Sequence, residues 1–498
     1  MMVAGNTASG VGSMSLSCLL DRPDCVGGDT VITGLQLDSR KVCGGDLFLA
    51  LPGDVHDGRQ FIEQAVANGA AAVVAEAPVA GFVDELPVPL VEIPELRLDA
   101  GVLAARFFDF PSRDLHTVGV TGTNGKTTTS RLVAQLGRAL GKTCGVIGTL
   151  GATLDENVAE SANTTPDAVS LQRQLADWRD QGVTTISMEV SSHALVQGRV
   201  SGVEFETAIY TNLSHDHLDY HGSMDEYGRA KLQLFASEGL RHAVVNIDDE
   251  YARQVLATIG EGVRVLTYSA SGAEADIRVL ETRFHEAGVD GELVTPWGTG
   301  RFTSPLPGEF NLANLAAAVT AVVLSGEDLA SVLQVVSGLQ PVPGRMQAIP
   351  NDQGLQVIID YAHTPDALEQ VLTSLKAHVS GDLIVVFGCG GDRDNAKRQV
   401  MGRVASQLAD RVFVTSDNPR SEDPAAILAD IASGCSGNFV LVVDRDEAIF
   451  RSIAEARRGD CVVVAGKGHE DYQLVEGERR PFSDAAHARD ALARRVAS

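Results

Sequence analysis

The chain has 498 residues, which is too long for one hydrophobic core and suits about three domains of roughly 100–200 residues each. Its hydrophobic content of 44% and charged content of 21% are ordinary for a globular protein. The formal net charge of −26 argues against a nucleic-acid-binding protein, whose affinity depends on an excess of lysine and arginine.

The sequence predicts a cytoplasmic protein with reduced thiols. Apolar runs such as residues 315–324 are far shorter than the roughly 20 residues that span a bilayer. The first residues lack the basic and apolar regions of a secretory signal, and residues 1 to about 15 read as a mobile tail. Seven scattered cysteines without a CxxC pair indicate no disulfide framework and no zinc knuckle.

We expect a small N-terminal α/β domain over residues 1–112. Short β-branched runs predict strands within residues 31–93, and residues 59–68 carry apolar side chains at helical spacing.

A central domain is predicted over residues 113–341. Residues 116–140 pass from a strand through a glycine turn into an amphipathic helix, as in a phosphate-binding βα unit. Further strands alternate with helices, which implies a mostly parallel sheet, and residues 275–304 form a β-rich patch.

A Pro and Gly break at residues 339–347 precedes a third domain, predicted over residues 342–498. Its apolar runs are each followed by a helical segment, which is typical of a doubly wound, Rossmann-like sheet. Ligands of such sheets bind beyond the carboxyl ends of the strands.

The segment TGTNGKTT, residues 121–128, is a short P-loop. Its backbone N–H groups suit phosphates, Lys126 neutralises them, and Thr127 is placed to ligate Mg²⁺. The loop is a variant, because Val120 stands where the usual pattern has its first glycine. The predicted nucleotide-binding residues are Gly122, Thr123, Asn124, Gly125, Lys126, Thr127 and Thr128.

Two further segments carry groups suited to a cation-assisted reaction. Glu189 ends a strand and is a candidate Mg²⁺ ligand, although a glutamate there is often only a solvated residue or a cap. His215, His217 and His221 lie with two aspartates in NLSHDHLDYH, without the cysteines or HExxH helix of a zinc site.

The segments GTNGKTT, EVSSHAL, NLSHDHLDYH with the following AK, GEFNLANLAAA, PGRMQ, DYAHTPD, DNPR and GKGHEDYQ occur in this order in the one chain. Together they resemble the Mur ligases, over nearly the whole chain from about residue 35. The resemblance implies three α/β domains: an N-terminal uridine-binding domain, a central P-loop ATPase-like domain and a C-terminal Rossmann-like domain that binds an amino acid.

Within this resemblance, the first two domains hold the nucleotide-linked substrate. The uridine end matches Leu37, Ser39, Asp54, Val55 and His56, which without the family would read as an ordinary strand and turn. The muramoyl dipeptide matches Asn163, Thr164, Thr165, Ser191, Gln197 and Arg199. Hydroxyls and amides suit peptide groups, and an arginine fork suits a carboxylate or phosphate.

The resemblance also supplies the metal and ATP contacts. Lys231 matches a lysine that CO₂ converts to a carbamate, an anion able to ligate Mg²⁺ beside His217; a surface helix lysine is the alternative. Asn311, Asn314, Arg345 and Asp360 match groups around ATP, although an Asn pair at helical spacing could equally be a cap or a loop tie.

The amino-acid acceptor is expected at DNPR and GKGHE. Asp417, Asn418, Pro419 and Arg420 follow a predicted strand, and Arg420 with Arg393 would bind the extra carboxylate of meso-diaminopimelate. Gly466 and Glu470 would hold its distal amine. The alternative is a simple Asn-Pro turn with Arg420 in solvent.

The resemblance implies ATP-dependent addition of meso-diaminopimelate to UDP-N-acetylmuramoyl-L-alanyl-D-glutamate in peptidoglycan synthesis, and we expect a monomer without nucleic-acid or membrane partners. Lys126, Glu189, His217 and Lys231 are the expected catalytic residues, with Thr127 as a further metal ligand. The alternatives are a folylpolyglutamate synthase, a lysine-adding relative and a regulatory nucleotide-binding protein without ligase activity.

Overall fold

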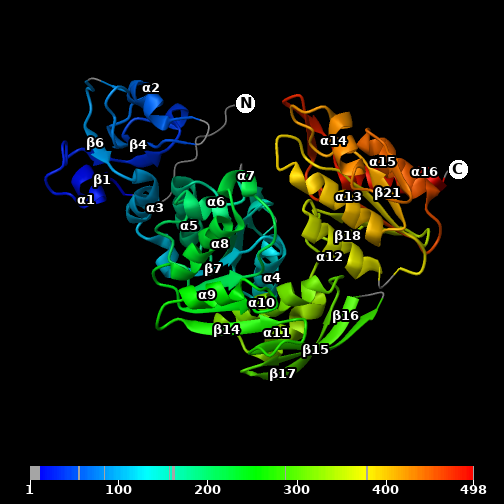
Figure 1. Ribbon diagram of the computed structural model, residues 1–498. Helices are drawn as coiled ribbons and strands as arrows, with labels where there is room; N and C mark the ends of the chain where they lie inside the picture. Colours follow the sequence, from blue (N-terminus) through cyan, green and yellow to red (C-terminus); the bar gives the residue numbers. More distant parts are fainter. Residues whose placement is uncertain are drawn as a thin grey trace.

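The computed structural model describes residues 12–53, 56–83, 85–155, 157–159, 163–285, 288–376 and 379–496. The chain forms three α/β parts, which Figure 1 shows in blue at the upper left, mainly green below, and yellow to red at the upper right. The predicted boundaries at residues 112/113 and 341/342 fall between the three main sheets. None of the helices in these ranges is long and apolar enough to span a membrane.

The first part is a parallel sheet with helices on both faces. Its strands, in the order of the sheet, are β3 (Gly34–Gln36), β4 (Asp46–Ala50), β5 (Ala72–Glu76) and β6 (Leu90–Ile93). In β4, Leu47 and Leu49 pack in one core and Phe48 and Ala50 in the other, as alternating side chains of a doubly covered strand must. Helices α1 (Leu16–Leu20) and α3 (Leu96–Phe107) cover the first face, and α2 (Ile62–Ala67) covers the second.

The predicted tail is wrong at its inner end. Met14 and Ser15 form strand β1 (Met14–Ser15), which pairs antiparallel with β2 (Val31–Ile32). The side chain of Ser15 also accepts a bond from the Cys18 N–H and caps α1. The first 15 residues are mostly small and polar, and within such a segment a helix-capping serine is hard to recognise. The fold therefore begins earlier than predicted.

The central sheet has the order β10-β9-β8-β11-β7-β12-β13-β14-β15-β16-β17. Its strands are β7 (His116–Thr121), β8 (Cys144–Gly148), β9 (Gly151–Leu154), β10 (Asn157–Ala159), β11 (Thr185–Glu189), β12 (Thr207–Tyr210), β13 (His242–Asn246), β14 (Arg264–Ser269), β15 (Ile277–His285), β16 (Gly288–Thr295) and β17 (Gly298–Ser304). Strands from β8 through β14 run parallel in the sheet, and the predicted β-rich patch continues it as the antiparallel β15, β16 and β17.

Helices cover both faces of the central sheet. They are α4 (Lys126–Ala139), α5 (Ala168–Asp180), α6 (Ser192–Val196), α7 (Leu218–His221), α8 (Met224–Leu232), α9 (Ala252–Thr258), α10 (Phe310–Leu324) and α11 (Leu329–Val335). Helices α4 and α10 share one core with β7, and α5 packs in the core of the opposite face. The almost wholly apolar α10 lies buried between its neighbours, as an all-round hydrophobic helix should.

The third part confirms the doubly wound prediction. Its sheet has the order β18 (Gln347–Ala348), β19 (Gln356–Asp360), β23 (Cys461–Ala465), β20 (Leu383–Phe387), β21 (Arg411–Val414) and β22 (Phe439–Leu441), with β18 alone antiparallel. Helices α12 (Pro365–Lys376), α13 (Ala396–Leu408) and α14 (Pro424–Ala432) cover one face, and α15 (Arg445–Glu455) and α16 (Asp484–Val496) cover the other. A hairpin of β24 (Tyr472–Val475) and β25 (Glu478–Pro481) adjoins Arg420.

Candidate active site

The P-loop joins β7 to α4, as predicted, and glycine is required at two of its positions. Gly125 has φ +86°, and a Cβ there would lie 2.5 Å from Asn314 Oδ1. At Gly122, with φ +149°, a Cβ would lie 1.9 Å from Thr211 Oγ1. Because only glycine avoids both the strain and these close contacts, the two glycines allow the tight turn that leads from β7 into α4.

The ammonium group of Lys126 lies inside this loop. Its Nζ donates to the carbonyl oxygens of Gly122 (2.8 Å) and Thr123 (2.7 Å). Burial lowers the pKa of Lys126, and the nearby carboxylates of Glu189 and Asp216 oppose that shift. A cation held only by neutral carbonyls is well placed to move onto phosphate oxygens.

The structure brings together Thr127 and Glu189, 62 residues apart in the chain. Thr127 Oγ1 donates to Glu189 Oε2 at 2.9 Å, and the backbone N–H of Thr149 donates to Glu189 Oε1 at 2.8 Å. A guanidinium N–H of Arg345 reaches Thr127 Oγ1 at 3.3 Å. A hydroxyl and a carboxylate oxygen, both suitable Mg²⁺ donors, therefore meet at the start of α4.

Lys231 is buried, so the alternative of a surface lysine is wrong. Its Nζ donates to Gly122 O at 2.9 Å and lies 4.0 Å from the centre of the Tyr227 ring. Burial, and next the charge of Lys126, lower the pKa of Lys231 well below its ordinary value. The two lysines thus share one carbonyl acceptor.

His217 also adjoins Tyr227, with ring centres 5.9 Å apart in an edge-on arrangement. Its φ of +54° places it just before α7, and its Nε2 is 3.4 Å from Asp216 Oδ2. Burial lowers the pKa of His217 to about 3, although Asp216 opposes the shift, which favours the neutral imidazole that binds metals. Within the described residues, no three His, Cys, Asp or Glu side chains form a metal-binding group.

The residues predicted around ATP lie at the P-loop and at the entry to the third part. Asn314 accepts from Thr129 Oγ1 (3.2 Å) and donates to Asn311 Oδ1 (3.1 Å). The carboxylate of Asp360 accepts from the N–H groups of Met346 (2.7 Å) and Ala362 (2.8 Å). In this structure the Asn pair ties α10 to α4, and Asp360 fixes the segment that follows Arg345.

A cavity of about 690 Å³ lies between the first part and the central part. It is lined by Leu37, Asp38, Ser39, Arg40, Phe48, Leu51, Pro52, Gly53, His56, Gly58, Phe61, Gln64, Arg97, Ala100, Asp167, Ala168, Gln197 and Arg199. Five of these are predicted substrate residues, while Asp54 and Val55 lie outside the described residues. Its lining holds three arginines and two aspartates, of which Arg40 and Asp38 pair at 2.8 Å, so it is slightly positive in an acidic chain and suits an anionic ligand.

The predicted dipeptide residues lead from this cavity to Glu189. Arg199 donates to Thr165 O at 2.9 Å, and Thr165 Oγ1 donates to Glu189 O at 2.8 Å. Thr164 Oγ1 lies 3.1 Å from Thr149 Oγ1, and Ser191 caps α6. Asn163 precedes Thr164 directly. A polar strip therefore connects the cavity to the site where Thr127 and Glu189 meet.

The two predicted acceptor loops meet beyond the carboxyl ends of β21 and β23. Asn418 donates to Glu470 Oε2 at 2.9 Å, and a Cβ on Gly466 would lie 2.6 Å from Asp417 Oδ2. Arg420 is not free in solvent, because its guanidinium donates to Gly391 O at 2.6 Å. Pro419 directly precedes it.

Two residues of this region differ from the expected picture. Arg393 pairs with Asp219 of the central part at 3.8 Å, so in this conformation its charge faces the other domain. Lys467, which is not among the predicted site residues, is fully buried, and its Nζ donates to Asn418 Oδ1 (3.0 Å) and Glu470 Oε2 (2.7 Å). The sequence signal that could have identified Lys467 is its position between two glycines in GKGHE, three residues before the predicted Glu470.

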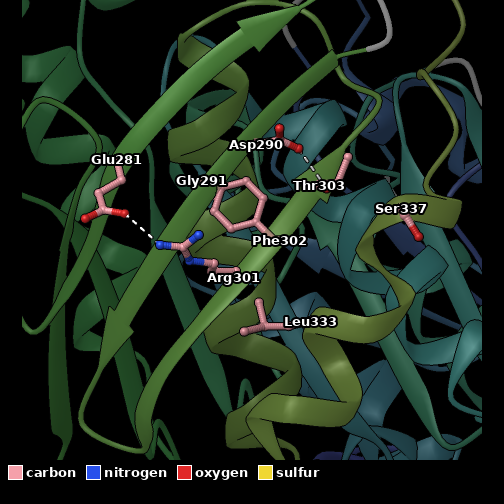
Figure 2. Close-up of a pocket in the computed structure, with 8 residues that line it drawn as sticks. All are labelled: Glu281, Asp290, Gly291, Arg301, Phe302, Thr303, Leu333 and Ser337. Carbon is pink, nitrogen blue, oxygen red and sulfur yellow. Dashed lines mark hydrogen bonds and ion pairs between the residues drawn. The ribbon is translucent and has the colours of Figure 1, made fainter.

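Another cavity, of about 340 Å³, lies on the β15–β17 sheet beside α11 (Figure 2). Glu281 pairs with Arg301 at its edge, and Thr303 donates to Asp290. None of its lining residues belongs to the predicted site, and its charged side chains are already in ion pairs, Glu281 with Arg301 and Asp290 with Arg283.

The fold and the loop at Lys126 define a P-loop nucleotide-binding protein of three α/β parts. Its sequence matches the Mur ligase family catalytic domain over residues 31–107, the Mur ligase middle domain over 120–322, and the Mur ligase glutamate ligase domain over 344–468. The chain belongs to the Mur ligase family, and it is an ATP-dependent amide-bond-forming ligase.

Its relatives include two proteins named UDP-N-acetylmuramoyl-L-alanyl-D-glutamate--2,6-diaminopimelate ligase. The one from Ectopseudomonas mendocina (strain ymp) is 50% identical over 93% of this chain and 95% of its own. The one from Pseudomonas aeruginosa is 48% identical over 93% and 96%. A solved structure of a ligase with this name is 40% identical, covers 97% of this chain and 100% of that chain, and has a TM-score of 0.72.

Proposed function

We propose that the enzyme adds meso-2,6-diaminopimelate to UDP-N-acetylmuramoyl-L-alanyl-D-glutamate and releases the UDP-linked tripeptide, ADP and phosphate. The names of close full-length relatives support this substrate pair. The observation that carries the proposal is the continuous polar path from the cavity of about 690 Å³ to the contact between Thr127 and Glu189. With its uridine end bound in the cavity, the nucleotide-linked substrate would extend along this path. Its terminal carboxylate would then lie at the P-loop, where the reaction requires it.

The first chemical step transfers the γ-phosphoryl group of ATP to the terminal carboxylate of the D-glutamyl residue, and ADP leaves. Lys126 and the N–H groups of the loop bind the phosphates and offset the charge that develops on the transferred group. Asn311, Asn314, Arg345 and Asp360 surround the rest of the nucleotide. The guanidinium of Arg345 already donates to the Thr127 hydroxyl. It is therefore well placed to bind the phosphates of ATP when the domains close.

In the second step, the amine of meso-diaminopimelate attacks the carbonyl carbon of the acyl phosphate. A tetrahedral intermediate forms, the amine loses its proton, and phosphate leaves. An acyl phosphate is a far better acylating agent than a carboxylate, so the phosphoryl transfer makes amide formation possible. Closure around the acceptor also excludes water, which would otherwise hydrolyse the intermediate.

The site fits Mg²⁺. Thr127 and Glu189 present adjoining oxygen donors, and His217 presents a neutral imidazole beside Tyr227, the ring that Lys231 also contacts. Bound Mg²⁺ would neutralise charge on the phosphates and on the transferred group.

We further propose that Lys231 carries a carbamate. As free amines, Lys126 and Lys231 donate to the same oxygen of Gly122, so two ammonium groups there would repel each other. The lowered pKa of Lys231 favours the neutral amine that reacts with CO₂. A carbamate on Lys231 is an anion, so it would attract the Lys126 ammonium and not repel it. Its oxygen atoms would also serve as ligands for Mg²⁺.

The acceptor site of this proposal lies between the loops after β21 and β23. Arg420, assisted by Asn418 and by Arg393 after domain closure, binds the distal carboxylate of the acceptor. Glu470 and Gly466 hold the distal amine, with Asp417 and Pro419 shaping the loop. The distal ends of meso-diaminopimelate and lysine differ by that carboxylate, so a cation there selects between them.

The alternatives are less well supported. A folylpolyglutamate synthase is expected to lack the uridine-binding domain, and this chain has a Mur ligase match over residues 31–107. A purely regulatory nucleotide-binding protein would have no reason to keep Lys126, Glu189, His217, Lys231 and Arg420 together.

A phosphate-release assay with the UDP-muramoyl dipeptide and a panel of amino acids tests the proposal. Phosphate release with another acceptor but not with meso-diaminopimelate would contradict it. A cytoplasmic, monomeric enzyme remains part of the proposal.

Replacing Arg420 with alanine is expected to weaken use of meso-diaminopimelate by about 2–4 kcal/mol in kcat/KM, because the distal carboxylate loses its partner in a closed site. Apparent ATP affinity should change little. Arg403→Ala, at an exposed arginine of α13, is the matched control and should behave as wild type. Unchanged acceptor kinetics in folded Arg420→Ala would show that this arginine does not bind the acceptor.

A further inference from the structure

The third part contains an ion pair that is completely buried. Arg445, the first residue of α15, and Asp484, the first residue of α16, both have no exposed side-chain surface. The pair is bidentate, with Nε to Oδ1 and Nη2 to Oδ2 both at 2.7 Å. Neither residue belongs to the predicted site.

The remaining donors of Arg445 reach the ends of two strands. Nη1 donates to Ser416 O at 3.2 Å, and Nη2 also donates to Ala465 O at 2.9 Å. Ser416 directly precedes Asp417, and Ala465 directly precedes Gly466. Strands β21 and β23 flank β20 in the sheet, so one guanidinium spans the gap between the starts of both acceptor loops.

The position of this pair points to a role other than stability. A buried ion pair costs desolvation that its attraction only partly offsets, and well-packed apolar residues often replace such pairs without loss of stability. Apolar side chains, however, could not donate the hydrogen bonds to the carbonyl oxygens of Ser416 and Ala465. The planar guanidinium fixes the directions of those bonds and, through them, the separation of the two backbones.

Charge couples the pair to the same loops. Burial disfavours the charged form of Arg445, but the carboxylate of Asp484, and more weakly those of Asp417 and Glu470, keep the pKa of Arg445 raised. Two carboxylates of the acceptor loops thus interact electrostatically with the guanidinium that Asp484 orients.

We propose that Arg445, oriented by Asp484, is a positioning residue that sets the distance between the DNPR and GKGHE loops and thereby determines acceptor binding. The inference rests on the proposed function, which places the acceptor between these loops. Arg445 does not touch the acceptor itself. It acts through the backbones that carry Asn418, Arg420 and Glu470.

The test is a double variant, Arg445→Met with Asp484→Leu, which removes both charges and leaves none buried without a partner. We expect a folded variant with a modestly lower melting temperature, since no charge stays buried without a partner but the carbonyls of Ser416 and Ala465 each lose a donor. The KM for meso-diaminopimelate should rise at least about tenfold, because two charge-assisted bonds that position the loops are lost. The KM for ATP and for the UDP-muramoyl dipeptide should change less than about twofold.

Ile449→Ala is the matched control, since Ile449 is fully buried one turn further along α15 and contacts neither loop through a hydrogen bond. It should lower the melting temperature and leave all three KM values unchanged. If the double variant does not fold, Asp484→Asn serves instead, because the amide keeps the shape of the carboxylate while removing its charge. Its acceptor KM should rise by a smaller factor.

A wild-type acceptor KM in the folded double variant, or in Asp484→Asn where that variant replaces it, would overturn the inference. An equal rise in the KM for ATP would do the same, because it would indicate a general structural defect. If the wild-type enzyme uses another amino acid, the proposed function is wrong, and the same variants are then measured with that amino acid. An acceptor-specific rise would still support the role of Arg445.

Discussion

Lys126→Ala is expected to lose ligation by at least about 10²–10³-fold in kcat, the effect of removing one preorganised charge donor from a transition state. The loop is held by Gly122 and Gly125 and by bonds from Asn124 N to Asn212 Oδ1, so it should keep its shape without the lysine side chain. The measurement is ADP formation with saturating substrates, together with a thermal melt. The melting temperature should remain close to that of the wild type.

Lys142→Ala is the control for this variant. Lys142 lies shortly after α4, pairs with Glu327 at 3.0 Å and is remote from the loop in sequence, so activity should be retained. Near-normal turnover in folded Lys126→Ala would mean that the nucleotide site has been assigned to the wrong loop.

Lys231→Ala is expected to be nearly inactive, by at least about 10²-fold, because the cation loses an anionic ligand beside the P-loop. Acetate or formate should restore part of the activity by occupying the space of the carbamate. The same carboxylates should not restore Lys126→Ala, which lacks a cation rather than an anion. This difference separates the roles of two lysines that share one backbone acceptor.

The carbamate itself is observable by ¹³C NMR of the enzyme prepared with ¹³C-bicarbonate. The wild type should give a carbamate signal that is absent from Lys231→Ala. A crystal structure of the Mg²⁺-ATP complex prepared with bicarbonate and showing an unmodified ammonium at Lys231 would count decisively against the modification.

Much of the fold could be predicted because its elements carry local signals. The apolar runs at β4, β20 and β23 are buried on both faces, which makes them continuous in sequence and easy to recognise. The start of the fold was missed, because Met14 and Ser15 pair with residues that lie beyond a helix. Pairing across such a distance leaves little trace in a short polar segment.

The residues of the candidate site also fall into those that a local sequence pattern predicts and those that it does not. The P-loop residues could be named from one segment, because a strand, a glycine turn and a helix follow one another directly. The contact of Thr127 with Glu189 depends on β7 and β11 lying side by side, which no local pattern specifies. Lys467 and Arg445 were missed because a buried cation is recognised only by its partners, and those partners come from other strands.

The central claim is that this ligase joins meso-diaminopimelate to the UDP-muramoyl dipeptide. The most direct test is a competition in which the purified enzyme receives the dipeptide, ATP, and equal concentrations of meso-diaminopimelate and L-lysine, with products identified by mass spectrometry. The account predicts the diaminopimelate-containing tripeptide almost exclusively, with one ADP formed per product. Preferential incorporation of L-lysine, or ADP formation without either tripeptide, would contradict it.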